Sequence, residues 1–256
     1  MELTSSARWD AAADDYQKVF LQGQNSYNKA IFQYWEQNDM LRPGFRVLDI
    51  GCGVGKYGVL FAERACDVTL VDFSPEMLRH AAENMAQFSA PWRTYCCDFT
   101  KVRGDEPIFA EGFDFSISTM SPAVCDVETV RKMSAITRGS CFLSRFRSWE
   151  QPLRNEVLRR AGEEPHGYFD DPEGECESMI RAVREAGFEP QVKTVDYNWS
   201  DLRSPEEMAR VLQHGSRTLH CGTEALIRAA RSLSDVGVVN DAVYTTVAWI
   251  SWRTSV

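Results

Sequence analysis

Short apolar runs alternate with stretches of helical periodicity along most of this 256-residue chain. Apolar residues that recur at helical spacing predict amphipathic helices, and short apolar runs bounded by turn residues predict buried strands. Strands that alternate with helices are typical of a doubly wound α/β fold, a mainly parallel sheet with helices on both faces. The apolar runs predict seven strands, near residues 46–50, 67–72, 92–97, 113–120, 140–147, 189–197 and 243–253.

A glycine-rich turn directly follows the first predicted strand. Residues Asp49 to Gly55 read Asp-Ile-Gly-Cys-Gly-Val-Gly. Glycine adopts positive φ angles and leaves no Cβ between the turn and a ligand. The helix predicted from Lys56 would direct its free N–H groups at an anionic ligand group. Such a turn fits either a dinucleotide or S-adenosylmethionine, so the turn alone leaves both cofactors open.

One alternative is a nicotinamide or flavin dinucleotide. Gly53, Gly55 and Gly58 satisfy the Gly-x-Gly-x-x-Gly pattern, and Asp72 follows about 20 residues later, where a ribose-binding acid is expected. Residues 1–44 precede the first strand, however, and carry helical patterning, whereas dinucleotide-dependent dehydrogenases commonly begin close to that strand. A NAD(P)-dependent oxidoreductase is therefore kept as an alternative only.

The Asp-x-Gly-x-Gly-x-Gly segment at Asp49 to Gly55 resembles the first motif of class I S-adenosylmethionine-dependent methyltransferases of the small-molecule type. Three further segments in the family's order support the resemblance: a strand ending at Asp72, another ending near Asp98, and the strand at residues 113–120. The resemblance implies a Rossmann-like seven-stranded sheet whose last strand runs antiparallel. It also implies S-adenosyl-L-methionine as the cofactor.

The resemblance further implies positions around the cofactor. Asp49 and the glycine turn would hold the methionine portion, and Asp98 with Phe99 would contact the adenine. Asp72 would hold the ribose, which agrees with its chemistry, because an acceptor-only carboxylate can receive two vicinal hydroxyl donors. The predicted cofactor-binding residues are Tyr16, Asp49, Gly51, Gly53, Gly55, Asp72, Phe73, Met77, Asp98, Phe99, Thr119 and Met120. Neither a metal ligand nor a catalytic residue is assigned.

Residues 1–44 are predicted to form an N-terminal helical segment. Its Trp9-Asp10 pair followed by Tyr16 resembles the N-terminal helix of small-molecule methyltransferases, in which a tyrosine at the Tyr16 position approaches the methionine end of the cofactor. The alternative is that Trp9 and Tyr16 only pack in the apolar stripe of a docked helix. Both roles stay open for Tyr16, since a tyrosine offers an apolar body and a hydroxyl.

The chain is predicted to form a single methyltransferase domain, residues 1–256. Residues 45–147 would form its cofactor-binding core, and residues 148–256 the half that determines the substrate. The second half contains a helical insert near residues 199–240, which we expect to cap the substrate. A surface decoration or a dimerisation element is the alternative for this insert.

An acidic stretch at residues 163–177 has three interpretations: a rim that attracts a cationic acceptor, a metal site around His166, or a solvated loop ahead of a helix. The solvated loop is favoured over both other interpretations. The metal site is disfavoured because its ligand spacing matches no recognised site. His214 and His220 flank a predicted helix junction, where one of them could act as a general base.

Composition restricts the partners. Lys and Arg number 28 against 37 Asp and Glu, and the resulting net charge of −9 disfavours nucleic acid. The sequence shows neither the apolar N-terminal segment of a signal peptide nor an apolar run of about 18 residues, so no membrane partner is expected. Eight cysteines without paired Cys-x-x-Cys spacing indicate a reduced, cytoplasmic protein without disulfides.

The sequence therefore predicts methyl transfer from S-adenosylmethionine to a small-molecule acceptor, whose attacking atom (N, O, S or C) is not determined. The tail of the fourth strand, Met120-Ser121-Pro122, departs from the Asn/Asp-Pro-Pro-aromatic signature of similar adenine and glutamine N-methyltransferases, which counts against those substrates. The alternatives are an RNA or protein methyltransferase, the oxidoreductase above, and a non-catalytic S-adenosylmethionine-binding protein. A homodimer is the partner arrangement left open.

Overall fold

The computed structural model describes residues 5–21, 26–103, 105–213, 219–234 and 236–254, so that His214 lies outside the described residues. The chain divides into two compact units. Unit 1 comprises Met1–Arg145, Glu177–Lys193 and Trp249–Val256, and unit 2 comprises Phe146–Cys176 and Thr194–Ala248. Whether both units fold together as the single expected domain stays a prediction.

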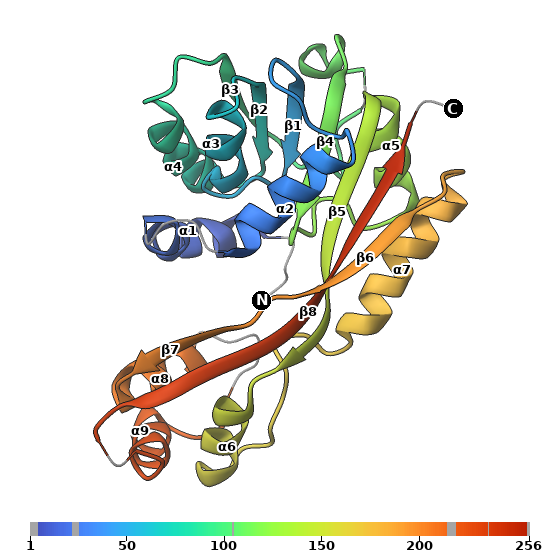
Figure 1. Ribbon diagram of the computed structural model, residues 1–256. Coiled ribbons are helices and arrows are strands. Elements are labelled where there is room, and N and C mark those ends of the chain that lie inside the picture. The colour runs from blue at the N-terminus through green and yellow to red at the C-terminus, as the bar shows by residue number, and fades with distance from the viewer. Residues whose placement is uncertain (1–4, 22–25, 104, 214–218, 235, 255–256) are drawn as a thin grey trace. The chain divides into compact units, whose positions relative to one another are not determined.

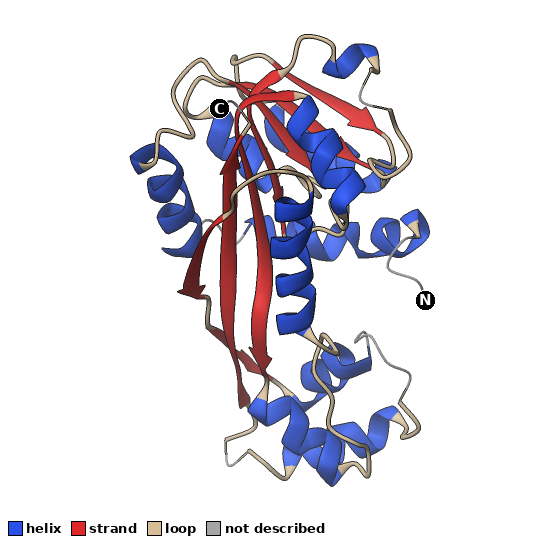
Figure 2. Ribbon diagram, turned by 90° about the vertical axis from the view of Figure 1, so that its right-hand side faces the viewer, coloured by secondary structure: helices blue, strands red, loops and turns tan. Residues whose placement is uncertain are grey.

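The strands form a mixed, mostly parallel sheet in the order β3-β2-β1-β4-β5-β8-β6, with β7 paired to β8 (Figures 1 and 2). Strand β1 pairs in parallel with β2 and with β4, and β7 pairs antiparallel with β8. The strands are β1 (Arg46–Ile50), β2 (Asp67–Asp72), β3 (Trp92–Cys96), β4 (Phe113–Thr119), β5 (Thr137–Glu150), β6 (Gln191–Asp196), β7 (Trp199–Arg203) and β8 (Val239–Arg253). The Rossmann-like fold class and the antiparallel last strand are confirmed.

Strand β7 is an eighth strand that the apolar pattern did not predict. It occupies the start of the segment expected to be a helical insert, and two helices follow it. Its residues Ser200, Asp201 and Leu202 are exposed, and its sequence Trp-Ser-Asp-Leu-Arg contains no apolar run of the kind that predicted the other strands. Its pairing with β8, in the register Trp199↔Val243 to Arg203↔Val239, defines it instead.

Helices flank the strands in both units. In unit 1 they are α1 (Ser6–Leu21), α2 (Ser26–Gln37), α3 (Lys56–Ala62), α4 (Pro75–Met85), α5 (Val127–Ala135), the short 3-10 helix η1 (Pro107–Phe109), and the part of α7 (Pro172–Glu185) that follows Cys176. In unit 2 they are α6 (Pro152–Arg160), α8 (Pro205–Gln213) and α9 (Thr223–Arg231). No helix among the described residues has the length and apolar character needed to cross a membrane.

An aromatic core holds the helices of unit 1 against its sheet. The fully buried Trp35 of α2 stacks on Phe61 of α3 and meets Phe115 of β4 and Phe142 of β5 edge-on. Such edge-to-face pairs contribute about 0.5–1.5 kcal/mol beyond the area they bury. Because these rings come from four separate elements, they fix α2 and α3 over the strands that carry the predicted site.

Part of the acidic stretch begins helix α7. Asp171 accepts a hydrogen bond from the backbone N–H of Gly174, and Glu173 and Glu175 lie in the first turn of the helix. Carboxylates at a helix N-terminus interact favourably with its partial positive charge. The described residues contain no group of three or more His, Cys, Asp or Glu side chains that could hold a metal ion. Helix initiation therefore accounts for this part of the stretch.

Unit 2 is held by an apolar cluster and by one buried charge. Helices α6, α8 and α9 pack their apolar faces together with Val239 of β8. Beside that cluster, Asp241 is fully buried and accepts two hydrogen bonds from Arg154, at 2.8 and 2.9 Å, and one from Arg203 at 2.8 Å. Burial acts to raise the pKa of Asp241, but its hydrogen bonds to both guanidinium groups hold the pKa below its ordinary value.

The Asp241→Asn variant should lose about 3 kcal/mol of unfolding free energy, because removing one member of a buried ion cluster leaves the other charges uncompensated. Urea denaturation at neutral pH measures this loss. Asp201→Asn is the matched control, since Asp201 also pairs with Arg203 but its side chain is 50% exposed. Exposed pairs contribute at most about 1 kcal/mol, so equal losses in the two variants would contradict the assigned role of Asp241.

Candidate active site

The predicted site residues of unit 1 gather at the carboxyl ends of the parallel strands, where ligands of open α/β sheets bind. The register aligns these ends: Asp49 of β1 lies beside Ile117 of β4, and Asp72 of β2 lies beside Cys96 of β3. The turn after β1 is tied to β2, because the N–H groups of Gly51 and Cys52 both donate to the carbonyl of Val71. Figure 1 shows β1, β2 and β4 side by side with α3 and α4 nearby.

The three predicted glycines of the turn all have positive φ, at 72° for Gly51, 53° for Gly53 and 78° for Gly55. Gly51 is also required by packing, since a Cβ there would lie 1.9 Å from the hydroxyl oxygen of Ser121 in the loop after β4. At Gly53 a Cβ would meet only the sulfur of Met77, at 3.9 Å. The absence of a side chain at Gly51 therefore allows the glycine turn and the loop after β4 to pack closely. At Gly53, by contrast, space remains beside the backbone.

Asp49 is the least satisfied group of the site. Its side chain is 1% exposed, and neither carboxylate oxygen has a hydrogen-bond partner among the described residues. Burial, together with the nearby charge of Asp72, raises the pKa of Asp49 to about 8. A buried polar group without a partner is costly and needs an explanation, so this carboxyl is suited to a ligand that brings a positive charge or hydrogen-bond donors.

Asp72 joins the glycine turn to helix α4. One of its oxygens accepts from the N–H of Gly53 and the other from the N–H of Ser74, each at 2.9 Å. Ser74 in turn caps α4 by accepting from the N–H of Met77 at 3.1 Å. Burial raises the pKa of Asp72, although both N–H groups act to lower it. A carboxylate oxygen has two lone pairs, so each oxygen keeps capacity for a further donor.

Asp98 organises its own turn after β3. Its Oδ1 accepts from the N–H and the hydroxyl of Thr100, at 3.0 and 2.6 Å, and Lys101 pairs with Oδ2 at 2.8 Å. Burial acts to raise the pKa of Asp98, but these hydrogen bonds bring it below its ordinary value. Phe99 is 2% exposed, and its carbonyl accepts from the Nζ of Lys132 on α5 at 2.8 Å. The roles of Asp98 and Phe99 toward adenine stay predictions.

The other predicted residues lie at three places. Met77 is buried on α4, and Phe73 is partly buried at the end of β2. Thr119 ends β4, and Met120 follows it with a φ of 50° and an N–H that donates to the carbonyl of Ser144. Tyr16 on α1 is 45% exposed, with its ring edge-on to Trp9 at 5.9 Å. The predicted approach of Tyr16 to the cofactor is not tested by this geometry.

Some residues at the site were missed from the sequence. Ser121 packs against Gly51, Lys132 fastens the loop that carries Phe99, and Asn84 of α4 donates to the carbonyl of Val54 in the glycine turn at 2.9 Å. Each is separated from its partner by thirty or more residues in the chain. Local sequence patterns therefore held no signal for these contacts.

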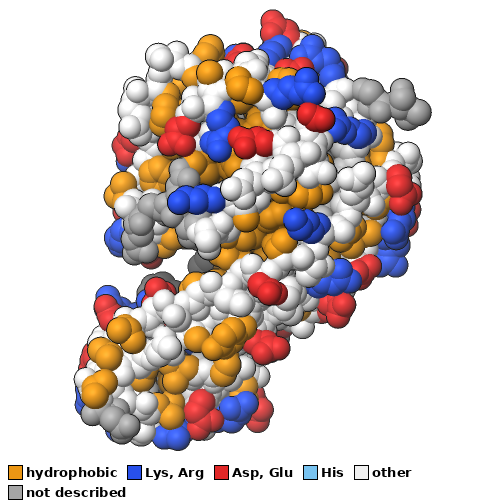
Figure 3. All heavy atoms as spheres, viewed as in Figure 1, with side chains coloured by type: hydrophobic (Ala, Val, Ile, Leu, Met, Phe, Trp, Pro, Cys, Tyr) orange, Lys and Arg blue, Asp and Glu red, His pale blue; other side chains and the backbone are white. Residues whose placement is uncertain are grey.

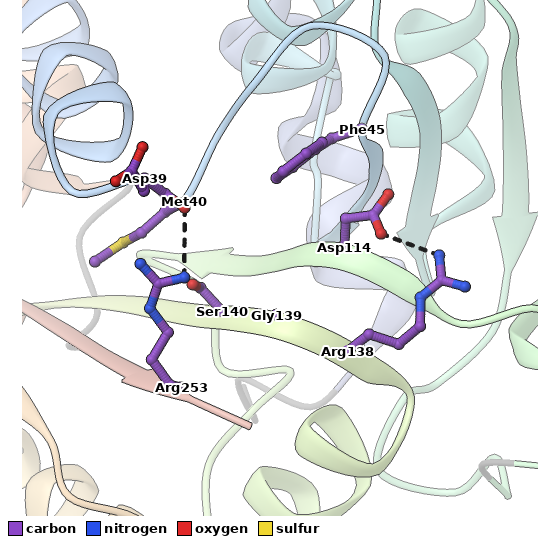
Figure 4. A pocket seen from close by; sticks show the side chains of 8 residues that line it. All are labelled: Asp39, Met40, Phe45, Asp114, Arg138, Gly139, Ser140 and Arg253. Carbon is purple, nitrogen blue, oxygen red and sulfur yellow. Dashed lines mark hydrogen bonds and ion pairs between the residues drawn. The ribbon is translucent and has the colours of Figure 1, made fainter. Parts of the chain in front are cut away.

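A cavity of about 140 Å³ in unit 1 lies at the opposite, amino-terminal edge of the parallel strands (Figure 4). It contains none of the predicted site residues. Its walls include Asp114 at the start of β4, which pairs with Arg138, and Arg253 near the end of β8. The lining residues are Asp39, Met40, Phe45, Asp114, Arg138, Gly139, Ser140 and Arg253.

The Gly51→Ala variant should be strongly destabilised, because the added Cβ meets Ser121 and the positive φ disfavours an L side chain. Gly44→Ala is the matched control, since its φ of 82° is similar and no heavy atom lies within 4 Å of the added Cβ. Overpacking costs about 1–3 kcal/mol, so urea denaturation should show Gly51→Ala less stable than Gly44→Ala by about that amount. Equal stabilities would contradict the tight contact between the two loops.

Comparison with known proteins supports a methyltransferase domain. Residues 47–138 match the family model described as a methyltransferase domain. Among curated proteins, the 23S rRNA (uracil(1939)-C(5))-methyltransferase of Alkalilimnicola ehrlichii is 33% identical over 75 residues. That alignment covers 29% of this chain and only 17% of the relative's length.

Solved structures share the fold over most of the chain. Magnesium protoporphyrin IX methyltransferase from Synechocystis PCC 6803, solved with bound S-adenosylhomocysteine, is 16% identical with a TM-score of 0.53, over 94% of this chain and 93% of that one. A candidate methyltransferase from Bacillus halodurans C-125 is 13% identical with a TM-score of 0.52, over 88% and 98%. Precorrin 8w decarboxylase from Methanobacterium thermoautotrophicum is 13% identical with a TM-score of 0.50, over 90% and 91%.

The family match contains the glycine turn, Asp72 and Asp98, and the surrounding strands form the mostly parallel sheet with an antiparallel last strand that the family resemblance implied. Residues 47–138 therefore carry a methyltransferase domain, and the strands around them have the fold of the S-adenosylmethionine-dependent methyltransferases that the sequence resembles.

Proposed function

We propose that this protein transfers the methyl group of S-adenosylmethionine to a small-molecule acceptor, with the cofactor bound at the carboxyl ends of β1, β2 and β3. The unpartnered carboxyl of Asp49 carries this proposal. It lies buried beneath a glycine turn whose Gly53 leaves space beside the backbone. A cofactor with a sulfonium and an ammonium group would supply the positively charged partner that the Asp49 carboxylate lacks.

The other residues fit the remaining parts of the cofactor. Asp72 keeps acceptor capacity for the ribose hydroxyls while the N–H groups of Gly53 and Ser74 fix its orientation. Asp98 and Phe99 would border the adenine, and Lys132 holds the backbone between β3 and η1 in place. Tyr16, Phe73, Met77, Thr119 and Met120 complete the proposed site. The cofactor supplies an activated methyl group, and the chain's residues bind and orient the reactants, which can contribute about 7–11 kcal/mol.

A small acceptor is supported by charge. The net charge of −9 opposes a phosphate backbone, and on the face seen in Figure 3 the acidic and basic side chains are interspersed. RNA methylation is the second candidate, favoured by the similarity to the rRNA methyltransferase over 75 residues. We also propose a cytoplasmic location, since eight cysteines without paired Cys-x-x-Cys spacing are typical of proteins in a reducing compartment.

A ligand panel tests the cofactor first. Thermal unfolding is compared with S-adenosylmethionine, S-adenosylhomocysteine, NADH and NADPH at matched concentrations. A ligand at 100 times its dissociation constant stabilises by about 2.7 kcal/mol, and each kcal/mol raises the midpoint by about 2–4 °C in a chain of this size. Stabilisation by a nicotinamide cofactor alone would overturn the proposal.

The acceptor is then sought with methyl-labelled cofactor. Label should appear in a small-molecule extract and not in RNA or protein fractions. Label in RNA would support the second candidate, and cofactor binding without label in any fraction would indicate a non-catalytic binding protein.

Asp72→Asn should weaken S-adenosylmethionine binding by about 1.5–3 kcal/mol, the range for losing hydrogen bonds to a charged group. Isothermal titration calorimetry measures the change. Asp67→Asn is the control at the opposite end of β2, where Asp67 pairs with Arg93. Unchanged affinity in Asp72→Asn would remove Asp72 from the ribose site.

The affinity for S-adenosylmethionine should rise as the pH increases from 6 toward 8 and then level off, because the Asp49 carboxyl has a pKa of about 8 and must ionise to face a cation. One linked proton allows at most about tenfold per pH unit. Asp49→Asn should weaken binding and flatten the profile measured by calorimetry.

The raised pKa of Asp49 predicts the opposite pH dependence for the stability of the unliganded protein. Its folded-state pKa lies above its unfolded value, so its contribution to stability falls as the pH rises from about 4 to about 8. Asp49→Asn should therefore raise the thermal midpoint at neutral pH without ligand. If Asp49→Asn had a lower thermal midpoint than the unmodified protein, and if its affinity for S-adenosylmethionine still rose with pH, both expectations would be contradicted.

A further inference from the structure

Helix α1 docks on α4 through a row of polar contacts. Asp10, Asp14 and Gln17 follow one another at helical spacing and so share one face of α1. Asp14 lies 2.8 Å from Nε2 of His80. The side-chain amides of Gln17 and Asn84 exchange two hydrogen bonds of 2.8 Å.

Beside this row lies a small apolar contact. Ala13 of α1 packs against Val54 of the glycine turn and Met77 of α4. Both helices belong to unit 1 and are labelled in Figure 1.

Asp10 differs from the other members of the row because its contacts reach the proposed ribose site. Its Oδ1 accepts from the hydroxyl of Ser74 at 2.5 Å and from the N–H of Glu76 at 3.3 Å. The N–H of Ser74 donates to Oδ1 of Asp72, whose Oδ2 accepts from the N–H of Gly53. A continuous chain of hydrogen bonds thus connects α1 with the glycine turn.

Two hydrogen bonds fix the orientation of the Ser74 hydroxyl. It donates to Asp10 and accepts from the N–H of Met77, and Ser74 is fully buried. Without Asp10 the hydroxyl would lose its acceptor, and the N–H of Glu76 would lose the carboxylate that faces it. Ser74 could then rotate or shift, and its N–H would orient Asp72 less strictly. Burial raises the pKa of Asp72, and the negative charge of Asp10 acts in the same direction to a smaller extent.

We propose that Asp10 is a positioning residue for the ribose-binding carboxylate of Asp72 and couples the docking of α1 to cofactor binding. This inference rests on the proposed function, in which Asp72 holds the ribose. Coupling between two equilibria is reciprocal, so bound cofactor should also hold α1 more firmly on α4. The sequence placed Asp10 in a helix pattern without a role, because its partners lie 64 and 66 residues away.

The test compares Asp10→Ala with Asp14→Ala, which breaks the contact to His80 one turn further along the same helix and leaves Ser74 untouched. Calorimetry gives the affinity for S-adenosylhomocysteine, and hydrogen exchange of residues 6–21 reports the docking of α1. Both variants should exchange faster than the unmodified protein. Only Asp10→Ala should bind more weakly, by about 5- to 30-fold. Equal affinity losses in the two variants would reduce Asp10 to a structural contact and overturn the proposal.

Asp10→Asn keeps an oxygen that can accept from the Ser74 hydroxyl and removes the charge. It should therefore bind almost as tightly as the unmodified protein, and it keeps the test valid if Asp10→Ala is poorly folded.

Asp72→Asn separates this inference from the proposed function. If Asp72→Asn binds normally, the proposed function fails. If Asp72→Asn binds weakly and Asp10→Ala binds normally, only the positioning role fails. In the double variant Asp10→Ala/Asp72→Asn the losses should be less than additive, because both changes act through one carboxylate, and strict additivity would contradict the chain of hydrogen bonds.

Discussion

A buried carboxyl without a partner, Asp49, is the constraint on which the site of unit 1 depends. An isolated ionised carboxylate is costly inside a protein, and the usual response is a raised pKa. The chain maintains this group under a turn of three glycines with positive φ, with one of them pressed against Ser121. A buried carboxyl without a partner lowers stability and persists where the surrounding structure fixes it, which is typical of functional sites.

The elements around Asp49 supply that support. Trp35 and its aromatic neighbours fix α2 and α3 over β4 and β5. Asp72 links the glycine turn to the N-terminus of α4, and Ser74 extends the link to α1. A ligand that satisfies Asp49 would therefore act on a network of backbone amides and carboxylates that is already oriented, which reduces the cost of binding.

Unit 2 has a separate basis for its stability and carries the part of the chain in which no motif was found. Its helices share an apolar cluster, and Asp241 joins α6 to β7 through two arginines. The fold alone does not assign a reaction, since one structure with this fold is a precorrin decarboxylase. The identity of the acceptor therefore depends on side chains that the family resemblance does not cover.

The sequence by itself determined the parts of this protein whose physical cause lies within a few neighbouring residues. Apolar runs predicted the central strands, and glycine spacing predicted the turn after β1, which the structure confirms. Strand β7 escaped prediction because its sequence contains no apolar run and its pairing with β8 holds it in place. Only the tertiary structure decided that Asp49 has no partner, that Gly51 meets Ser121, and that Asp10 reaches Ser74. Those contacts join residues far apart in the chain, and they form only when helices and strands pack, so no local pattern can encode them.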